Sequence, residues 1–209
     1  MKRSLLLLGV IAALAIGAPA YSQYIWMDVN GDGVNTSADV LTSSVTSIHV
    51  YLDTDNVKGG GAPTATCGGN PLDIGLFDVL FRSSGTGSVT YNGFNLGSGM
   101  TGFAVLNAFT VQGTDAGVGY TGPNYLPPGT YELGQLQVTI TGTPIISFLP
   151  EAANQATMPS PNTAFGSHCD GSDHPNYITL NVDFFDADGT ASTTDTQETT
   201  WGKIKKLYR

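Results

Sequence analysis

Charged residues are scarce in this chain of 209 residues, in which they make up only 12%. Basic residues are the scarcest: between Tyr24 and Thr200 they are Lys58 and Arg82, whereas all 17 acidic residues fall in that stretch. The formal net charge is −9. A nucleic acid is therefore excluded as a partner, because binding phosphates needs a basic face. An acidic body instead favours divalent cations where carboxylates converge.

Long apolar runs are also missing, apart from one near the N-terminus. Leu5–Ile16 follows two basic residues, and the small residues Ala18 and Ala20 come after it. This order predicts a secretory signal peptide over residues 1–22. The run is short for a membrane span, so we expect no transmembrane segment once it is removed; a retained signal anchor is the alternative. The mature protein is expected to be secreted, extracellular or at the surface of a bacterium.

Cysteine occurs only twice, at Cys67 and Cys169. In the oxidising compartment that export implies, an even pair predicts a disulfide, with two free thiols as the alternative. The bond would close a loop of roughly 100 residues and stabilise the fold by about 4–5 kcal/mol in the chain-entropy view.

Helical periodicity is absent, and turn formers are abundant, with 27 Gly and 11 Pro. Apolar and polar residues alternate with period two in three segments, 48–53, 135–140 and 178–184, which predicts strands with one buried face. Less regular strands are expected at Ile74–Phe81, Ser88–Phe94, Phe103–Val111 and Ile145–Leu149, with turns such as "GTP" between them. The predicted fold is all-β: a single β-sandwich over residues 47–189 with about seven to nine strands, for which a jelly roll is one possible connectivity.

Residues 47–189 also resemble the cohesin and carbohydrate-binding-module group of sandwiches. The resemblance rests on "LDIGLFDVLFRS", "GTYELGQLQVTITGTPIISFL" and "YITLNVDFFDADG". It implies a cohesin-like sandwich that opens on a bulged amphipathic strand and closes on strands before an acidic turn.

The stretch "DVNGDGVNTSAD" has the oxygen spacing of a twelve-residue calcium loop. Gly33 falls at position 6, where such a loop turns sharply. Positions 1, 3, 5, 7, 9 and 12 hold the predicted Ca²⁺ ligands Asp28, Asn30, Asp32, the Val34 carbonyl, Thr36 and Asp39. The loop is similar to the calcium loop of dockerins, and residues 23–46 are assigned to this segment. It departs from the pattern at Asn35, where an apolar residue is usual, and no helix is expected to follow. A polar turn without metal is the alternative.

Two further D-x-D pairs lie at predicted strand ends. Asp53 and Asp55 follow the first strand, and Asp186 and Asp188 follow the last. Each pair begins like a calcium loop, and neighbouring terminal strands would bring both near the opening loop. Solvated strand ends are the alternative.

Catalytic motifs are missing: no G-x-S-x-G, H-E-x-x-H or phosphate loop occurs. "HCDGSDH", from His168 to His174, contains metal-ligand residue types, but its Gly-Ser context favours a turn. We therefore expect a protein that is not an enzyme.

The C-terminus differs from the rest of the chain. Residues 190–200 are predicted to be a flexible Thr/Ser-rich linker. The tail, residues 201–209, reads "WGKIKKLYR" and is basic and amphipathic. Its predicted anchoring residues are Trp201, Lys203, Ile204, Lys205, Lys206, Leu207, Tyr208 and Arg209. The tail either anchors or sorts the protein or packs on its own sandwich.

These observations favour an exported, calcium-binding structural or adhesive protein of the cell surface or extracellular space. Its partners would be copies of itself or another surface protein. The alternative is a module that recognises a polysaccharide, with aromatic rings stacked on sugars. An exposed coplanar row of rings would support the sugar hypothesis, whereas unpaired strand edges filled by a segment of a neighbouring molecule would support assembly. The candidate rings are Tyr24, Trp26, Tyr91, Phe94, Tyr120 and Tyr125.

Overall fold

The computed structural model describes residues 23–36, 38–55, 72–154, 157–168, 176–180, 185–188 and 190–192. Ten strands and one short 3-10 helix form this part, so the predicted all-β class is confirmed. Among the described residues, no helix has the length and apolar character to span a membrane. The elements are β1 (Tyr24–Asp28), β2 (Ser47–Asp53), β3 (Ile74–Leu96), η1 (Ser98–Met100), β4 (Ala104–Gln112), β5 (Asp115–Leu126), β6 (Thr130–Phe148), β7 (Ala164–Ser167), β8 (Asn176–Thr179), β9 (Phe185–Asp188) and β10 (Thr190–Ser192).

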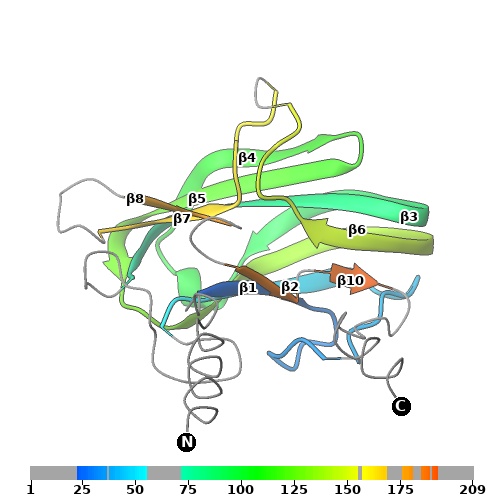
Figure 1. The fold of residues 1–209 in the computed structure, drawn as a ribbon, viewed down its shortest axis with the longest axis horizontal. Coiled ribbons are helices and arrows are strands. Elements are labelled where there is room, and N and C mark those ends of the chain that lie inside the picture. Colours follow the sequence, from blue (N-terminus) through cyan, green and yellow to red (C-terminus); the bar gives the residue numbers. More distant parts are fainter. Residues whose placement is uncertain are drawn as a thin grey trace, which may run out of the picture.

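Two long strands, β3 and β6, connect the two sides of the molecule. In Figure 1, β4 and β5 lie on one side, β1, β2 and β10 on the other, and β3 and β6 between them. The first half of β3 pairs with β5, and the second half pairs with β6. β6 in turn pairs with β2, which is followed by β1 and β9. The hydrogen-bonded order is therefore β4-β5-β3-β6-β2-β1-β9, with β7 on β3, β8 on β7 and β10 on β6.

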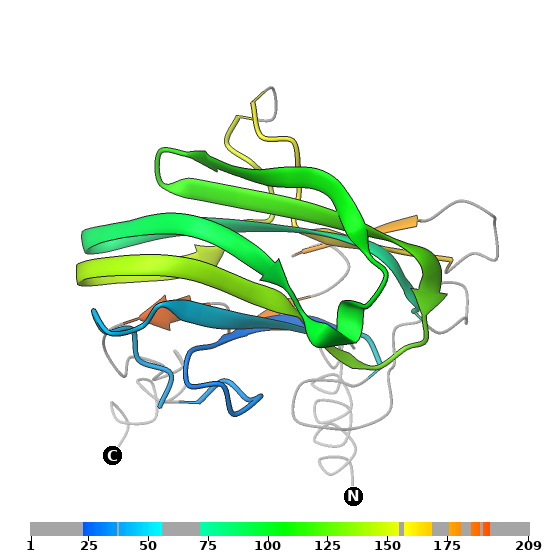
Figure 2. The same cartoon turned by 180° about the vertical axis from the view of Figure 1, so that it is seen from behind.

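The sheet becomes a sandwich because β3 and β6 bend back on themselves together, as Figure 2 shows from behind. Phe77 and Phe94 are 17 positions apart on β3, which is about 56 Å in a straight strand. Both rings nevertheless contact Tyr120, at centroid distances of 5.5 Å and 6.1 Å. The two halves of β3 therefore face each other across one core.

Glycine makes the bend in the two strands possible. Gly87 on β3 is paired with Gly142 on β6, and both have positive φ, 128° and 76°. A Cβ on Gly87 would lie 2.1 Å from the Thr141 carbonyl oxygen, so no side chain fits there. The predicted breaks after Phe81 and at "GTP" are therefore corners within continuous strands, because the backbone pairing persists through them.

The core follows the predicted alternation. On β2, Ile48, Val50 and Leu52 are buried, and the two residues between them are half-buried. Leu136 and Val138 on β6 are buried in the same cluster. Burying one such side chain stabilises a fold by about 1.5–3 kcal/mol, so this face fixes the register of both strands.

The first half of β3 is buried on both faces, which explains its weak alternation. Phe77 and Phe81 point into the core, whereas Leu80 packs with Ala152 and Met158 outside it. The segment between β6 and β7 therefore covers the outer face of this layer.

The strands at the two ends of the chain differ most from the prediction. β1 lies in the segment assigned to the calcium loop and pairs with β2, so the sandwich begins at Tyr24. β10 takes the first residues of the predicted linker, 190–192, and pairs with β6. Of the strand predicted over 178–184, only residues up to 180 are described; 181–184 lie outside the described residues.

Candidate functional site

The N-terminal loop coils around two carboxylates. Asp28 ends β1, and its two oxygens accept backbone N–H bonds from Gly31 and Gly33, both at 2.7 Å. Asp39 accepts backbone N–H bonds from Val29 at 2.6 Å and Thr36 at 2.7 Å. Gly31 and Gly33 have positive φ, 78° and 86°, as the sharp turn at position 6 requires.

This loop places the carboxylates of Asp28 and Asp39 against each other. Both side chains are buried, with 0% and 8% of their residue surface exposed. Burial is the main cause that raises the pKa of Asp28, the charge of Asp39 raises it further, and the two amides partly oppose this. Like charges repel each other more strongly at such buried positions than they do in water.

The other predicted ligands in the loop are held by their near neighbours. Asp32 is exposed and accepts bonds from the Val34 amide and from Asn30 Nδ2, both at 3.0 Å. The Asn30 side-chain oxygen accepts the Asp32 amide, and the Thr36 hydroxyl accepts the Ala38 amide. Within the described residues, no three His, Cys, Asp or Glu side chains are grouped closely enough to hold a metal. The structure thus brings Asp28 and Asp39 together, whereas Asp32 belongs to an exposed turn.

Asp53 and Asp55 lie at the other end of the hairpin formed by β1 and β2. Tyr24 is the partner of Asp53, whereas Asp28 is the partner of His49. Four residues of strand separate the two acidic groups, which is about 13 Å. The expectation that this pair lies near the opening loop is therefore wrong, because the antiparallel register puts it at the opposite end.

The Asp53 carboxylate is itself well bonded. It accepts the Thr130 hydroxyl at 2.8 Å and the Asp55 amide at 3.0 Å. Burial, followed by the contact with Asp53, raises the pKa of Asp55. The two acids form a second close pair, distinct from the one in the loop.

Asp186 and Asp188 are on β9, which runs parallel to β1. Asp186 is paired with Ile25 and Asp188 with Trp26, so the backbone of this pair does lie beside the strand that leads into the loop. Several other predictions concern residues outside the described ones: the signal peptide over 1–22, the disulfide between Cys67 and Cys169, and the tail over 201–209.

The aromatic residues do not form a flat row. Tyr24, Trp26 and Tyr51 share the outer face of β1 and β2, with ring centroids 4.9 Å and 5.2 Å apart and interplanar angles of 29° and 12°. At such distances near-parallel rings cover one another's faces. Trp26 is 5% exposed. The candidates Tyr91, Phe94 and Tyr120 are also buried, and all three belong to the core.

A serine, a histidine and an aspartate meet near the "HCDGSDH" stretch, but not as a catalytic triad. The Ser167 hydroxyl donates to Asp73 Oδ1 at 2.7 Å, and His168 Nδ1 lies 3.2 Å from Asp73 Oδ2. In a triad the histidine takes the serine proton. Here the serine hydroxyl donates its hydrogen bond to the carboxylate and not to the histidine, and Ser167 is fully buried. Residues 169–174 lie outside the described residues.

Sequence reasoning missed a pocket on the outer face of the layer formed by β3, β4 and β5. The register aligns Asp78 with Gly119, and Gly119 with Asn107, across these three strands. Because glycine has no side chain, Asp78 and Asn107 meet above it: Asn107 Nδ2 donates to Asp78 Oδ1 at 2.8 Å. The Ser160 hydroxyl donates to the same oxygen at 2.6 Å.

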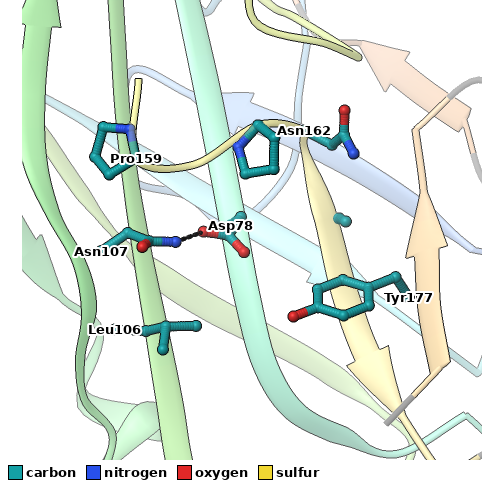
Figure 3. Close-up of a pocket in the computed structure, with 8 residues that line it drawn as sticks. Asp78, Leu106, Asn107, Pro159, Asn162 and Tyr177 are labelled. Atoms are coloured by element: carbon teal, nitrogen blue, oxygen red, sulfur yellow. Dashed lines mark hydrogen bonds between the residues drawn. The ribbon is translucent and has the colours of Figure 1, made fainter. Parts of the chain in front are cut away.

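The cavity above this carboxylate has a volume of about 410 Å³, and we call it the Asp78 pocket. Figure 3 shows Asn107, Leu106 and Tyr177 around Asp78. The lining residues are Asp78, Leu106, Asn107, Pro159, Pro161, Asn162, Ala164 and Tyr177. Asp78 is only 5% exposed, and burial raises its pKa, against the opposing effect of the bonds from Ser160 and Asn107. An acid within the apolar run "LFDVLF" is the sequence signal that could have indicated this site.

Comparisons with known proteins found fold likenesses only. No protein family and no curated protein matches the chain. Among solved structures, it is similar to a cohesin module from a family 33 glycoside hydrolase of Clostridium perfringens, at 10% identity and a TM-score of 0.44, over 79% of this chain and 98% of that one. It is also similar to the sixth cohesin of scaffoldin B from Acetivibrio cellulolyticus, solved in complex with a dockerin, at 11% identity and a TM-score of 0.41, over 70% and 86%.

A non-cellulosomal cohesin from Archaeoglobus fulgidus matches at 10% identity and a TM-score of 0.38, over 68% of this chain and 83% of that one. All three of these structures are cohesins. With TM-scores of 0.38 to 0.44, they carry no argument about a partner or a ligand.

Proposed function

We propose that the protein is a non-catalytic structural or adhesive component, exported from a bacterial cell, stabilised by Ca²⁺ and assembled from copies of itself. The observation that carries this proposal is the edge of β4 that no strand of the described residues covers. Export is supported by the N-terminal sequence pattern over residues 1–22.

The edge of β4 has the features of a pairing surface. Within the described part of the chain, β4 pairs only with β5. Val105, Leu106 and Val111 are 59%, 45% and 45% exposed. An unpaired edge presents free N–H and C=O groups to another strand. Apolar side chains beside such an edge favour the addition of a further strand.

A second copy is the occupant that the charges favour. The nine residues of β4 include no charged one, in a chain of net charge −9. Two such acidic chains repel each other over most of their surface. An uncharged strand is where they can approach with the least repulsion.

Sedimentation velocity over a range of protein concentrations tests this assembly. We expect concentration-dependent association, which the double variant Val105→Glu/Val111→Glu abolishes because it adds carboxylates to the edge. Thr141→Glu, at an exposed position on β6, is the control for added charge. A protein that stays monomeric throughout, or an edge variant that associates like Thr141→Glu, would contradict the proposal.

Calcium is proposed at the N-terminal loop because Asp28 and Asp39 form a buried pair of carboxylates there. A divalent cation between them would replace the repulsion by two favourable contacts. The Asn30 amide oxygen and loop carbonyls belong to the same twelve residues and are hard oxygen ligands of the kind Ca²⁺ prefers.

Thermal unfolding with Ca²⁺ or with chelator tests the cation site. A ligand at 100 times its Kd stabilises the folded state by about 2.7 kcal/mol. That corresponds to a rise in Tm of roughly 5–10 °C for a chain of this size. We expect this rise for the native protein and for Glu151→Gln, but not for Asp28→Asn or Asp39→Asn. Equal melting curves with Ca²⁺ and with chelator, and no calorimetric binding, would exclude the site.

A further inference from the structure

The Asp78 pocket carries an unneutralised acid at its floor. Oδ1 accepts the bonds from Asn107 and Ser160 at 2.8 Å and 2.6 Å. Oδ2 accepts no hydrogen bond from the described residues, and the side chain lines the cavity. In Figure 3 this second oxygen points to the side where Tyr177 lies. A side chain that is 95% buried thus keeps one acceptor for a group inside the pocket.

None of the described basic residues balances this charge. Arg82 shares the outer face of β3, but its guanidinium makes two hydrogen bonds to Asp115, both at 2.7 Å. The residues that line the pocket include no Lys, Arg or His. A buried carboxylate with a free acceptor and no cation favours a positively charged donor.

The walls of the pocket suit a hydrocarbon chain. Leu106, Pro159 and Pro161 supply apolar surface, and Tyr177 adds a ring that is 56% exposed. Methylene stems of long cationic side chains lie along such surfaces. An ammonium group near an aromatic face gains a further electrostatic contact.

We propose that the Asp78 pocket binds an alkylammonium group, with the nitrogen at Asp78 Oδ2 and the carbon chain between Leu106, the two prolines and Tyr177. The group comes either from a lysine side chain of a protein or from a free aliphatic amine. A neutral sugar fits less well, because it would bring no positive charge to the buried carboxylate of Asp78. This site is separate from the calcium loop, whereas two of its lining residues, Leu106 and Asn107, belong to β4, the strand proposed for assembly.

Isothermal titration of the full chain with Nα-acetyl-lysine methylamide tests the proposal. The matched probe is Nα-acetyl-norleucine methylamide, which keeps the carbon chain and lacks the ammonium group. We expect the lysine probe to bind at least ten times more tightly than the norleucine probe. Equal binding of the two probes would overturn the proposal, and so would binding of neutral oligosaccharides in the absence of amine binding.

Single substitutions test whether the lysine probe binds in the Asp78 pocket. Asp78→Asn should weaken lysine-probe binding at least tenfold, and Tyr177→Ala should weaken it several-fold. Glu132→Gln removes one carboxylate from β6, outside the pocket, and should bind like the native chain. A folded Asp78→Asn protein that binds the probe with native affinity would refute the site. If Asp78→Asn does not fold, NMR of the native chain replaces it: probe-induced shifts are expected at Leu106 and Tyr177, and their absence would refute it equally.

Two further probes distinguish the sources of the ammonium group. If the ligand is a protein lysine, the peptide WGKIKKLYR, which is residues 201–209 of this chain, should bind more tightly than 1,5-diaminopentane. If the ligand is a free amine, the diamine should bind as tightly as the peptide or more tightly. Both results support the alkylammonium site, whereas failure of both probes to bind would overturn it.

Discussion

Gly119→Ala should destabilise the protein through the carboxylate that lies above it. A Cβ at this position would be 2.1 Å from Asp78 Oδ1 and 3.0 Å from Asn107 Nδ2. The Asp78 carboxylate cannot simply swing aside, because Asn107 and Ser160 both donate to the oxygen that clashes. Hydrogen bonds to a charged group contribute about 1.5–3 kcal/mol each. Losing both would cost about 3–6 kcal/mol, and partial relaxation reduces this to about 2–4 kcal/mol.

Urea and thermal unfolding measure this effect, with Gly99→Ala as the matched control. A Cβ on Gly99 would meet only the Tyr131 ring, at an ordinary 3.8 Å, so the same change of residue should have little effect there. A loss of about 2–4 kcal/mol corresponds to a decrease in Tm of roughly 5–15 °C.

A double-mutant cycle identifies the cause of the loss. If the clash acts through Asp78, Gly119→Ala should cost at least about 1 kcal/mol less in an Asp78→Ala background. The reasoning is refuted if Gly119→Ala is as stable as Gly99→Ala, or if its cost is the same in both backgrounds.

Three further predictions concern a bond, a titration and a truncation. Mass spectrometry of unreduced peptides should find Cys67 joined to Cys169; complete alkylation of both without reductant would reject the disulfide. Burial raises the pKa of Tyr91 to about 12. Its contribution to stability is therefore present below about pH 10 and lost as the pH rises through 12, and Tyr91→Phe should flatten this alkaline loss in unfolding measurements. Removing residues 199–209 should leave the Tm within about 2 °C but release the protein from cells or abolish assembly, whereas unfolding would show that the tail packs on the domain.

The strands that the sequence predicts well are those with one face in water. On β2, Ile48 and Val50 are buried while His49 is half-exposed, so the alternation of apolar and polar residues shows which face is buried. β1 shows no such alternation, because four of its five residues are buried. Alternation cannot appear where both faces are covered, and Tyr24–Asp28 therefore looked like part of the polar loop that follows it.

Glycine residues caused two kinds of error in the predicted strands. At Gly87 and Gly142 it suggested chain breaks, although backbone pairing continues through both positions. In "DAGVGYTGPNYL" it hid β5 altogether, because glycine and proline are poor strand formers. There each glycine makes room for a neighbour: Gly117 for Leu80, and Gly122 for Phe103. Such a role depends on the partner strand and not on the segment itself.

In the N-terminal loop, the spacing of the oxygen-bearing residues predicts the positions of some predicted ligands but not of others. Asp28 and Asp39 are brought together as the twelve-residue pattern predicts, because backbone amides of the loop bond to both. Asp32 does not join these two carboxylates, since the Val34 amide and the Asn30 side chain hold it in a local turn. Short-range Asx bonds compete with convergence on a common centre, and the residue types are the same in both cases.

The Asp78 pocket could not be predicted from any one segment of the sequence, because its residues come from different strands. Asp78 follows Phe77 in an apolar run, and Asn107 is 29 positions later in the sequence, on a different strand. They meet because β5 lies between their strands and places Gly119 opposite both. A shift of one residue in the β3–β5 register would place Asp78 opposite Val118 or Tyr120, whose side chains face the core, where an acid without partners is strongly unfavourable. The acid and the glycine therefore constrain each other.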